Sequence, residues 1–410
     1  MFWEKKLDRW ISRVYTQIGI PLRLKLWNGH QLDLGGSHPE VTIRVPKPSA
    51  LAYLVQPSLE SLGRAYVEGK LEVEGRLRAI IQIANQLAEL SQRHRSRLGR
   101  LFRARSHSKA QDARAIAYHY DVSNEFYQTF LDREMVYSCA YFVQGDEDLT
   151  TAQQKKIDHI LNKIALQPGQ RLLDIGCGWG ALVIRAAQRY GANCVGITLS
   201  AQQRAWASER IKMLGLENQV SIQLLDYRDV YGQYDRITSV GMFEHVGIKN
   251  LPLYFSKLSQ LLTEDGLIMN HGICTTNTDH RTARYGAGEF ISQYVFPHGE
   301  LPHIGTVMLA MQDGGLESID VENLRRHYAR TCMLWADNFE RNDELIRSLV
   351  DAKTYRIWRV YLAGCAHAFE HDWVSLYQVL CGKAGRASSE IVWSRRYMYN
   401  QTPAMTTPVI

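Results

Sequence analysis

Long apolar runs, paired cysteines and a leader-like start are all missing from this sequence, and each absence excludes a class of protein. No stretch reaches about 18 apolar residues, so we expect no transmembrane helix. The seven cysteines include no Cys-x-x-Cys pair, which argues against a disulfide framework or a structural zinc site and favours a reducing cytoplasm. The opening residues lack the apolar core of a signal peptide. Glu244-His245 lacks the second histidine of a zincin motif, so we expect no metal.

The composition that is present is typical of a globular protein with two domains. Of the 410 residues, 45% are hydrophobic and 22% are charged, and the chain is too long for one ordinary core. The charge is unevenly placed. Residues 1–112 hold 19 Lys and Arg against 10 Asp and Glu, whereas the remainder holds 29 against 32. The positive excess of the N-terminal part indicates an anionic partner, either a membrane surface or nucleic acid.

Two N-terminal segments supply most of this excess. Between residues 3 and 18, tryptophans and aliphatic residues recur at helical spacing, with basic residues on the other faces. This pattern fits an interfacial membrane helix or a helix docked on its own domain. Between residues 93 and 105, six arginines interrupted by Gly99 and serines indicate a charged linker, which is either solvated or able to hold anionic head groups.

The most informative segment reads as a buried strand that enters a glycine-rich turn and then a helix. Asp174 ends the strand, Gly176, Gly178 and Gly180 form the turn, and the helix follows over residues 181–190. Glycines let the backbone approach a ligand closely, and the new helix offers unpaired N–H groups beside it. The acid precedes the glycines, unlike the G-x-G-x-x-G fingerprint for NAD. This order suits a ligand with an amino acid and a ribose but no pyrophosphate, which is S-adenosylmethionine.

Downstream segments alternate between strand and helix patterns. Such alternation predicts a doubly wound α/β fold, in which helices cover both faces of a parallel sheet. Ligands bind these sheets beyond the carboxyl ends of the strands, where the candidate site residues fall. The further predicted strands are residues 193–198, 219–225, 236–240 and 266–271, and the further predicted helices are residues 201–214 and 251–262.

Several segments, in order, resemble the cyclopropane fatty acid synthase family, which includes the mycolic acid cyclopropane synthases. The resemblance covers roughly residues 113–381, and a looser match over residues 63–75 is to the small N-terminal domain of the longer bacterial synthases. The matching segments of the main region are residues 119–127, 137–142, 174–180, 196–200, 240–247, 296–302, 327–331 and 361–366.

The resemblance implies a Rossmann-like class I methyltransferase sheet with a helical insertion over the active site, plus a small N-terminal α+β domain. The expected organisation is an N-terminal lipid- and membrane-docking domain over residues 1–92, a basic linker over 93–112, a catalytic domain over 113–395 and a tail over 396–410. Aromatic residues between 285 and 296 fit an insertion that lines an acyl tunnel, and they fit an ordinary helical core almost as well.

The reaction of this family needs a site for a small anion. Methyl transfer to a cis double bond leaves a carbocation, and ring closure then requires a base, which in the family is a bound bicarbonate ion. The resemblance assigns this anion to Cys139, Glu244, His271, the backbone at Ile273 and Tyr328. His271 and Tyr328 can donate hydrogen bonds to an oxyanion. Glu244 would accept the bicarbonate O–H or orient His271.

The cysteines of the matched segments allow more than one interpretation. We expect Cys139 to line the anion site and not to act as a nucleophile, the alternative being a small buried hydrophobe. Cys365 lies in a family motif where a catalytic thiol is one assignment. We favour a core-filling role for Cys365, because residues 361–369 read as a packed helix.

The family pattern also assigns the contacts of the methyl donor. An acid grips the ribose hydroxyls in many methyltransferases at the end of the second strand, where this chain has Thr198, followed by Gln203. Asp174 and the glycine turn would face the methionine part, and Tyr227 and Arg228 would lie near the adenine. The full set of expected cofactor-binding residues is Tyr137, Ser138, Asp174, Gly176, Cys177, Gly178, Gly180, Thr198, Gln203, Tyr227 and Arg228.

By the resemblance, the chain converts unsaturated acyl chains of phospholipids to cyclopropane chains at a bilayer surface rich in anionic lipids. It would be cytoplasmic, peripherally attached to the inner face of the membrane, and a homodimer. A related lipid C-methyltransferase making a methyl-branched chain is the first alternative, and an RNA or small-molecule methyltransferase is the second. The chain has no Asn/Asp-Pro-Pro-Tyr/Phe motif and no RNA-module motif, so we expect no nucleic-acid partner. A catalytically idle lipid-binding protein is a third alternative, which the complete set of anion-site residues argues against.

Overall fold

The computed structural model describes residues 11–12, 21–35, 38–92, 122–278, 287–296, 299–386 and 393–399. Two units emerge from the internal contacts: residues 1–105, 281–297 and 335–371 form the first, and 106–280, 298–334 and 372–410 form the second. Nearly all of the predicted N-terminal basic helix, the basic linker over residues 93–112, and the tail from residue 400 onward lie outside the described residues.

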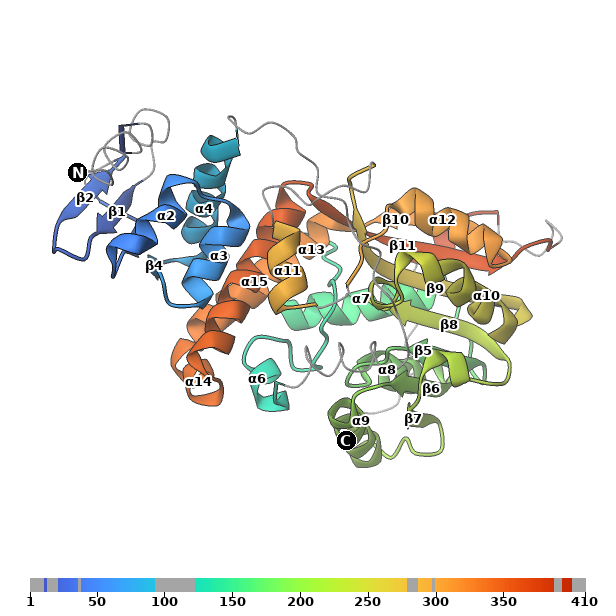
Figure 1. Ribbon diagram of the computed structural model, residues 1–410. Coiled ribbons are helices and arrows are strands. Elements are labelled where there is room, and N and C mark those ends of the chain that lie inside the picture. The colour runs from blue at the N-terminus through green and yellow to red at the C-terminus, as the bar shows by residue number, and fades with distance from the viewer. Residues whose placement is uncertain are drawn as a thin grey trace. The chain divides into compact units, whose positions relative to one another are not determined.

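A seven-stranded sheet forms the centre of the second unit (Figure 1). Its strand order is β10-β11-β9-β8-β5-β6-β7. Strands β5 to β9 run parallel, and β11 pairs antiparallel with both β9 and β10. The doubly wound sheet predicted from the sequence is therefore confirmed, whereas β10 and β11 were not predicted. The strands are β5 (Arg171–Ile175), β6 (Asn193–Thr198), β7 (Val220–Leu224), β8 (Tyr234–Val240), β9 (Leu262–Thr275), β10 (Leu316–Asn323) and β11 (Val374–Lys383).

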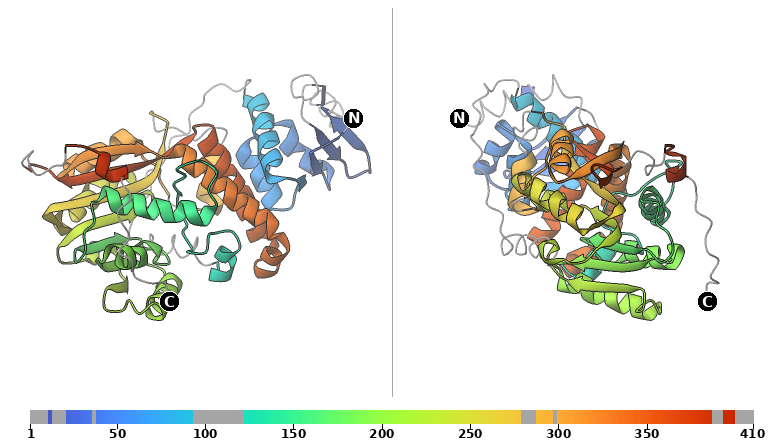
Figure 2. Two further views of the ribbon diagram at one scale, coloured as in Figure 1. Left: turned by 180° about the vertical axis from the view of Figure 1, so that it is seen from behind. Right: turned by 90° about the vertical axis from the view of Figure 1, so that its right-hand side faces the viewer.

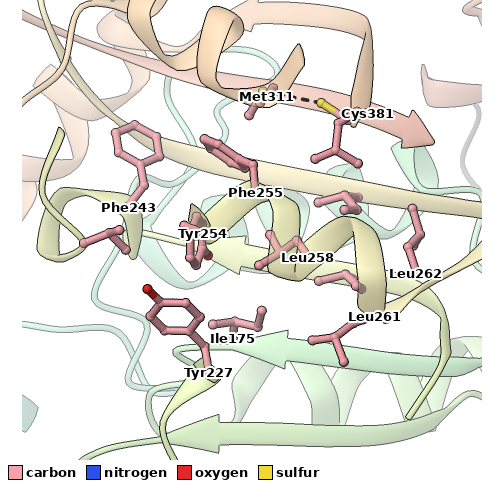
Figure 3. Close-up of a cluster of buried hydrophobic side chains, with 14 of the residues drawn as sticks. Ile175, Tyr227, Phe243, Tyr254, Phe255, Leu258, Leu261, Leu262, Met311 and Cys381 are labelled. Carbon is pink, nitrogen blue, oxygen red and sulfur yellow. Dashed lines mark hydrogen bonds between the residues drawn. The ribbon is translucent and has the colours of Figure 1, made fainter. Parts of the chain in front are cut away.

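Helices cover both faces of this sheet because successive residues of its strands point to opposite sides. Leu172 of β5 packs in one apolar cluster with residues of α7, α8 and α9, while Leu173 packs in another with residues of α10 and α12. Figure 3 shows Tyr254, Phe255 and Leu258 of α10 within the second cluster. The back view in Figure 2 shows α7 in front of the strands. The helices of this unit are α6 (Asn124–Gln128), α7 (Leu149–Lys163), α8 (Ala181–Tyr190), α9 (Ala201–Met213), α10 (Leu251–Leu261), α12 (Ile304–Asp313) and α16 (Arg396–Tyr399), with the first turns of α13 (Arg325–Arg341).

The helices of the second unit begin where the sequence supplies a cap. Asp148 and Ser200 accept hydrogen bonds from backbone N–H groups in the first turns of α7 and α9. Gly180 precedes α8 with a φ of +85°, a conformation that a Cβ would penalise. The predicted helices over residues 181–190, 201–214 and 251–262 end within one residue of α8, α9 and α10.

The first unit joins N-terminal residues with segments from much later in the chain. Its four-stranded sheet has the order β2-β1-β3-β4, and it has the small α+β character predicted for the N-terminal residues. Arg359 of α15 donates to the Tyr66 hydroxyl and to backbone oxygens of β4, and Phe290 of α11 packs directly over Gly63 of α3. The elements are β1 (Leu22–Lys25), β2 (Gln31–Leu34), β3 (Val41–Arg44), β4 (Glu72–Gly75), α2 (Leu51–Val55), α3 (Leu59–Val67), α4 (Leu77–Gln92), α11 (Ala287–Tyr294), α14 (Asp343–Leu349) and α15 (Ala352–Glu370).

Two kinds of feature are absent from the described residues. No helix in the described ranges is long and apolar enough to cross a membrane. No group of three or more His, Cys, Asp and Glu side chains in the same ranges is placed to hold a metal ion.

Candidate functional site

A pocket lies at the carboxyl ends of β5, β6 and β8, where a doubly wound sheet binds its ligand. Most of the predicted cofactor residues line it. Gly180 and Arg228 are the two that do not, although they adjoin lining residues in the sequence. The predicted residues that line the pocket are Tyr137, Ser138, Asp174, Gly176, Cys177, Gly178, Thr198, Gln203 and Tyr227.

The glycine turn forms one wall of this pocket. Gly176 and Gly178 have φ values of +80° and +55°, which expose the turn backbone without the cost that a side chain would add. The N–H groups of Gly176 and Cys177 donate to the Ile197 carbonyl, so the turn is tied to the end of β6. Cys177 is buried behind the turn, with its side chain against Gly196.

Asp174 places a buried carboxyl group in the same wall. It is 3% exposed, and the Thr238 hydroxyl of β8 donates to its Oδ1 across 2.7 Å. Burial raises its pKa to about 6, against the opposing effects of the Thr238 hydrogen bond and of the nearby Lys156 charge. The carboxyl therefore carries most of a negative charge at neutral pH inside a site that is poor in solvent.

Thr198 and Gln203 form a pair at the end of β6. The Thr198 hydroxyl donates to Gln203 Oε1 across 2.8 Å and accepts from the Ser200 N–H at 3.1 Å. The Gln203 amide group therefore keeps its two N–H donors for another acceptor. This pair supplies neutral hydrogen-bonding groups at the carboxyl end of β6.

In the turn after β7, the predicted adenine contact Arg228 is paired with a neighbouring carboxylate. Tyr227 and Asp226 line the pocket. Arg228 forms two hydrogen bonds with the Asp226 carboxylate, at 2.7 Å from Nε and 2.6 Å from Nη2, and its guanidinium lies over the Tyr227 ring. The contact of Arg228 with adenine stays a prediction.

The segment over residues 136–142 borders the pocket without any regular secondary structure. Side chains of α7 bind its polar groups: Gln153 donates to the Ser138 carbonyl across 2.8 Å, and Lys156 donates to the Ser138 hydroxyl across 2.8 Å. From α13, Thr331 accepts from the Ala140 N–H at 3.0 Å. The conformation of Tyr137 and Ser138 at the pocket is thus set by two helices.

Lys156 is a pocket residue that sequence reasoning missed. Its side chain is 2% exposed, and burial lowers its pKa to about 8. The available signal was its place on the buried stripe of α7, where Ala152, Ile160 and Lys163 recur at helical spacing. A lysine on such a stripe needs a partner or a ligand.

A second group of polar residues surrounds the ends of β8 and β9. Glu244 follows β8 in a short 3-10 helix (Phe243–His245), and its Oε1 accepts from the Ile273 N–H of β9 across 2.7 Å. Burial raises the Glu244 pKa to about 7. The N–H that the resemblance assigns to the anion is therefore the partner of Glu244 here.

Packing fixes the position of Glu244. A Cβ on Gly272 would lie 2.3 Å from the Phe243 ring, so only glycine at this position lets that ring pack against β9. Figure 3 shows Phe243 in the apolar cluster beside α10. The glycine thereby allows the 3-10 helix to hold its carboxylate at the Ile273 N–H.

His271 lies two residues before Ile273 on β9 and is 1% exposed. The Gln378 side-chain amide of β11 donates to its Nδ1 across 3.2 Å, which leaves the proton of the neutral ring on Nε2. Burial lowers its pKa well below the ordinary value, and the positive charges of Lys156 and Lys163 add to this effect. The ring is therefore a neutral donor through Nε2.

Two atoms of this group fit a small oxyanion. His271 Nε2 and Glu244 Oε2 are both buried and have no hydrogen-bond partner among the described residues. An unpaired buried polar group is costly, so such atoms commonly mark a ligand position. One N–H donor and one carboxylate acceptor match the oxyanion and the hydroxyl of bicarbonate.

The other predicted catalytic residues are Cys139, Tyr328 and Cys365, and their joint role stays a prediction. Cys139 is fully buried with its Sγ 3.2 Å from the Ala140 carbonyl, and burial raises its thiol pKa. Tyr328 is half-buried on α13 in the second unit. Cys365 lies on α15 in the first unit, where burial raises its pKa to about 12. Neither thiol has the lowered pKa of an activated nucleophile.

Known proteins are similar to this chain in sequence and in fold. A model of the mycolic acid cyclopropane synthetase family matches residues 107–379, and a domain of unknown function matches residues 10–96. A probable fatty acid methyltransferase from Pseudomonas putida is 49% identical over 391 residues, which cover 93% of this chain and 96% of that protein. The cyclopropane-fatty-acyl-phospholipid synthase of Escherichia coli K12 is 36% identical over 357 residues, covering 85% and 89%.

Solved structures of this family are also similar to the chain. A crystal structure of a mycolic acid cyclopropane synthase complexed with SAH and CTAB has a TM-score of 0.63 and 34% identity, over 66% of this chain and 98% of that one. This likeness shows that the two chains share a fold. The chain belongs to the mycolic acid cyclopropane synthetase family and is an S-adenosylmethionine-dependent methyltransferase.

Proposed function

We propose that this enzyme adds a methylene group from S-adenosylmethionine across a cis double bond of an unsaturated phospholipid acyl chain. The S–CH3 bond breaks as the alkene π electrons form a new C–C bond, which leaves a carbocation in the chain. Loss of a proton from the transferred methyl group then closes the cyclopropane ring. The observation that carries the proposal is the pair of buried unpartnered atoms, His271 Nε2 and Glu244 Oε2.

These two residues would hold the base for ring closure. His271 donates through Nε2 to an oxyanion, and Glu244 accepts the hydroxyl proton at Oε2 while Ile273 holds its other oxygen. When bound, bicarbonate supplies the base that takes the methyl proton. Because His271 is neutral, the carbocation has no acidic imidazolium beside it. The buried surroundings of His271 also exclude water that would otherwise quench the cation.

The pocket at β5, β6 and β8 would bind the methyl donor. Asp174 and the glycine turn face its methionine part, and Thr198 with Gln203 contact the ribose hydroxyls. Tyr227 and Arg228 lie near the adenine, and Tyr137 and Ser138 border the methionine end. Cys139 and Tyr328 complete the lining around the anion, and Cys365 fills the core of α15.

A methyl-branched product is the second candidate. The relative with 49% identity is named a probable fatty acid methyltransferase, a name that does not specify a ring. The same carbocation yields a methyl-branched alkene if a proton leaves a neighbouring chain carbon. A base held by His271 and Glu244 favours the cyclopropane, because it removes the proton from the methyl group itself.

We further propose that the protein attaches peripherally to the inner face of the membrane and prefers anionic lipids. The support is the charge of residues 1–112, which hold 19 basic residues against 10 acidic ones. Sedimentation with vesicles tests this directly. Equal sedimentation with neutral and anionic vesicles would contradict it. A homodimer is part of the same proposal and is measured by light scattering.

The test of the reaction is incubation with S-adenosylmethionine and one of three acceptors: vesicles of unsaturated phospholipid, the matching free fatty acid, or RNA. We expect mass spectrometry to find one added CH2 per converted double bond in the phospholipid chains alone. Methylated RNA with unchanged lipid would overturn the proposal.

A further inference from the structure

Helix α7 buries two lysines on the same face, and only one of them is paired with carboxylates. Lys163 is 0% exposed and is paired with Glu322 at 2.5 Å and with Asp320 at 3.4 Å. Lys156, two turns earlier, is 2% exposed and has no carboxylate within ion-pair distance in the described part of the chain. A buried cation without a counter-charge is expensive, so its retention requires an explanation.

The single hydrogen bond of Lys156 does not provide one. Its Nζ donates to the Ser138 hydroxyl across 2.8 Å, a neutral group that uses one of the three ammonium protons. Both residues line the pocket, so the remaining donors are at its wall. An anionic group of a ligand is the partner that this arrangement lacks.

Two carboxylates line the pocket: Asp226 is paired with Arg228, whereas Asp174, 3% exposed at the end of β5, has no ion-pair partner among the described residues. The charges of Lys156 and Asp174 influence each other, yet the two groups do not form an ion pair. Apart from the paired Asp226, the pocket thus offers one cation and one separate anion, which is complementary to a zwitterion. The free amino-acid end of S-adenosylmethionine, with its carboxylate and its ammonium group, is such a zwitterion.

We propose that the Lys156 ammonium group binds the carboxylate of the methyl donor, while the Ser138 hydroxyl holds the Lys156 side chain in place. Asp174 then binds the ammonium group of the donor. This inference rests on the assignment of the pocket to the methyl donor. It explains why α7, which carries none of the glycine-turn residues, places a lysine in the pocket. The contact also selects against nucleosides that lack the amino-acid end.

Calorimetric titration of the full chain with two ligands tests this role. S-adenosylhomocysteine keeps the carboxylate, whereas 5′-methylthioadenosine keeps the nucleoside and lacks the whole amino-acid end. We expect Lys156→Met to weaken the binding of S-adenosylhomocysteine by roughly 10- to 100-fold, because one charge-assisted hydrogen bond is lost. The affinity for methylthioadenosine should stay unchanged. Equal weakening of both ligands would show a merely structural role and overturn the proposal, as would no weakening of either.

The matched control is Lys155→Met. Lys155 is the next residue on α7, but its ammonium pairs with Glu147 at 2.7 Å and does not line the pocket. We expect this variant to bind both ligands as the wild type does. If the Lys155 variant loses as much affinity as the Lys156 variant, the effect is not one of the pocket charge and the proposal fails.

A measurement on the wild-type protein needs no variant to fold. Decarboxylated S-adenosylhomocysteine keeps the ammonium group and loses only the carboxylate, and we expect it to bind at least about 10-fold more weakly than S-adenosylhomocysteine. Equal binding of the two would overturn the role of Lys156. Failure of the wild type to bind S-adenosylhomocysteine at all would instead overturn the assignment of the pocket, so the two failures are distinguishable.

Discussion

The side-chain amide of Gln378 donates to Nδ1 of His271 across 3.2 Å, between directly paired residues of β11 and β9. The antiparallel strand β11 therefore determines which nitrogen of the histidine carries the proton. Without this contact either tautomer is available, and only the one protonated on Nε2 offers a donor to an oxyanion at that atom.

Replacing Gln378 by leucine should lower kcat by about 10-fold, because the ring then spends part of its time with the proton on Nδ1. The affinity for S-adenosylhomocysteine should stay unchanged, since Gln378 does not line the pocket. Steady-state kinetics and calorimetry separate the two effects. Ser375→Ala, which removes a hydrogen bond from the same strand, is the control and should leave kcat near the wild-type value.

Glu244→Gln should raise stability while abolishing ring closure. Burial raises the Glu244 pKa from the ordinary value of 4.5 to about 7. Between these values the folded protein binds more protons than the unfolded chain, so stability is full below pH 4.5 and is lost as pH rises through about 7. At pH 8 we expect the glutamine variant to be more stable by roughly 1–3 kcal/mol in urea unfolding. A glutamine variant that is less stable than the wild type at pH 8, or a stability difference from the wild type that is the same at pH 8 and at pH 4, contradicts this account.

Gly272→Ala should displace Phe243, whose ring lies 2.3 Å from the added Cβ. We expect a loss of roughly 1–3 kcal/mol in the free energy of unfolding, together with reduced activity as Glu244 moves from Ile273. Gly364→Ala is the matched control, because an added Cβ there meets no atom within 4 Å. On α15 that change should be neutral or stabilising by about 0.5–1 kcal/mol. Similar losses in both variants would rule out the packing explanation.

Thr198→Val should weaken nucleoside binding in general. It removes the hydroxyl that pairs with Gln203 Oε1 and leaves that oxygen without its donor. We expect S-adenosylhomocysteine and methylthioadenosine to lose similar affinity, roughly 5- to 30-fold each, because both contain the ribose. Calorimetry would refute the ribose assignment if only the ligand with the amino-acid end were affected.

The parts of the fold that could be predicted are those whose signals are local. Asp174 with its glycine turn, and the strands β5 to β9 that alternate with short helices, are readable because each element carries its own pattern and caps. Strands β10 and β11 are separated by the three helices α13 to α15, and they join the sheet in antiparallel pairs, unlike the parallel strands that precede them. Their place in the sheet depends on pairing with β9, which is distant in sequence.

The contacts of the site also divide into local ones, which the sequence indicates, and long-range ones, which it does not. Thr198 and Gln203 are five residues apart, so their pairing is a local matter. The contact of Glu244 with Ile273 joins residues 29 positions apart, and it depends on the packing of Phe243, which no local pattern encodes. Lys156 was missed because its helix reads as an ordinary amphipathic one, and only burial shows that its ammonium faces a pocket.

The most direct test of ring closure uses S-adenosylmethionine with a trideuterated methyl group, vesicles of unsaturated phospholipid and mass spectrometry of the acyl chains. A base held by His271 and Glu244 takes a hydrogen from the transferred methyl, so the account predicts that two deuterium atoms remain in a chain that resists hydrogenation. A product that keeps all three deuterium atoms and still takes up hydrogen would contradict it, and would identify a methyl-branched alkene.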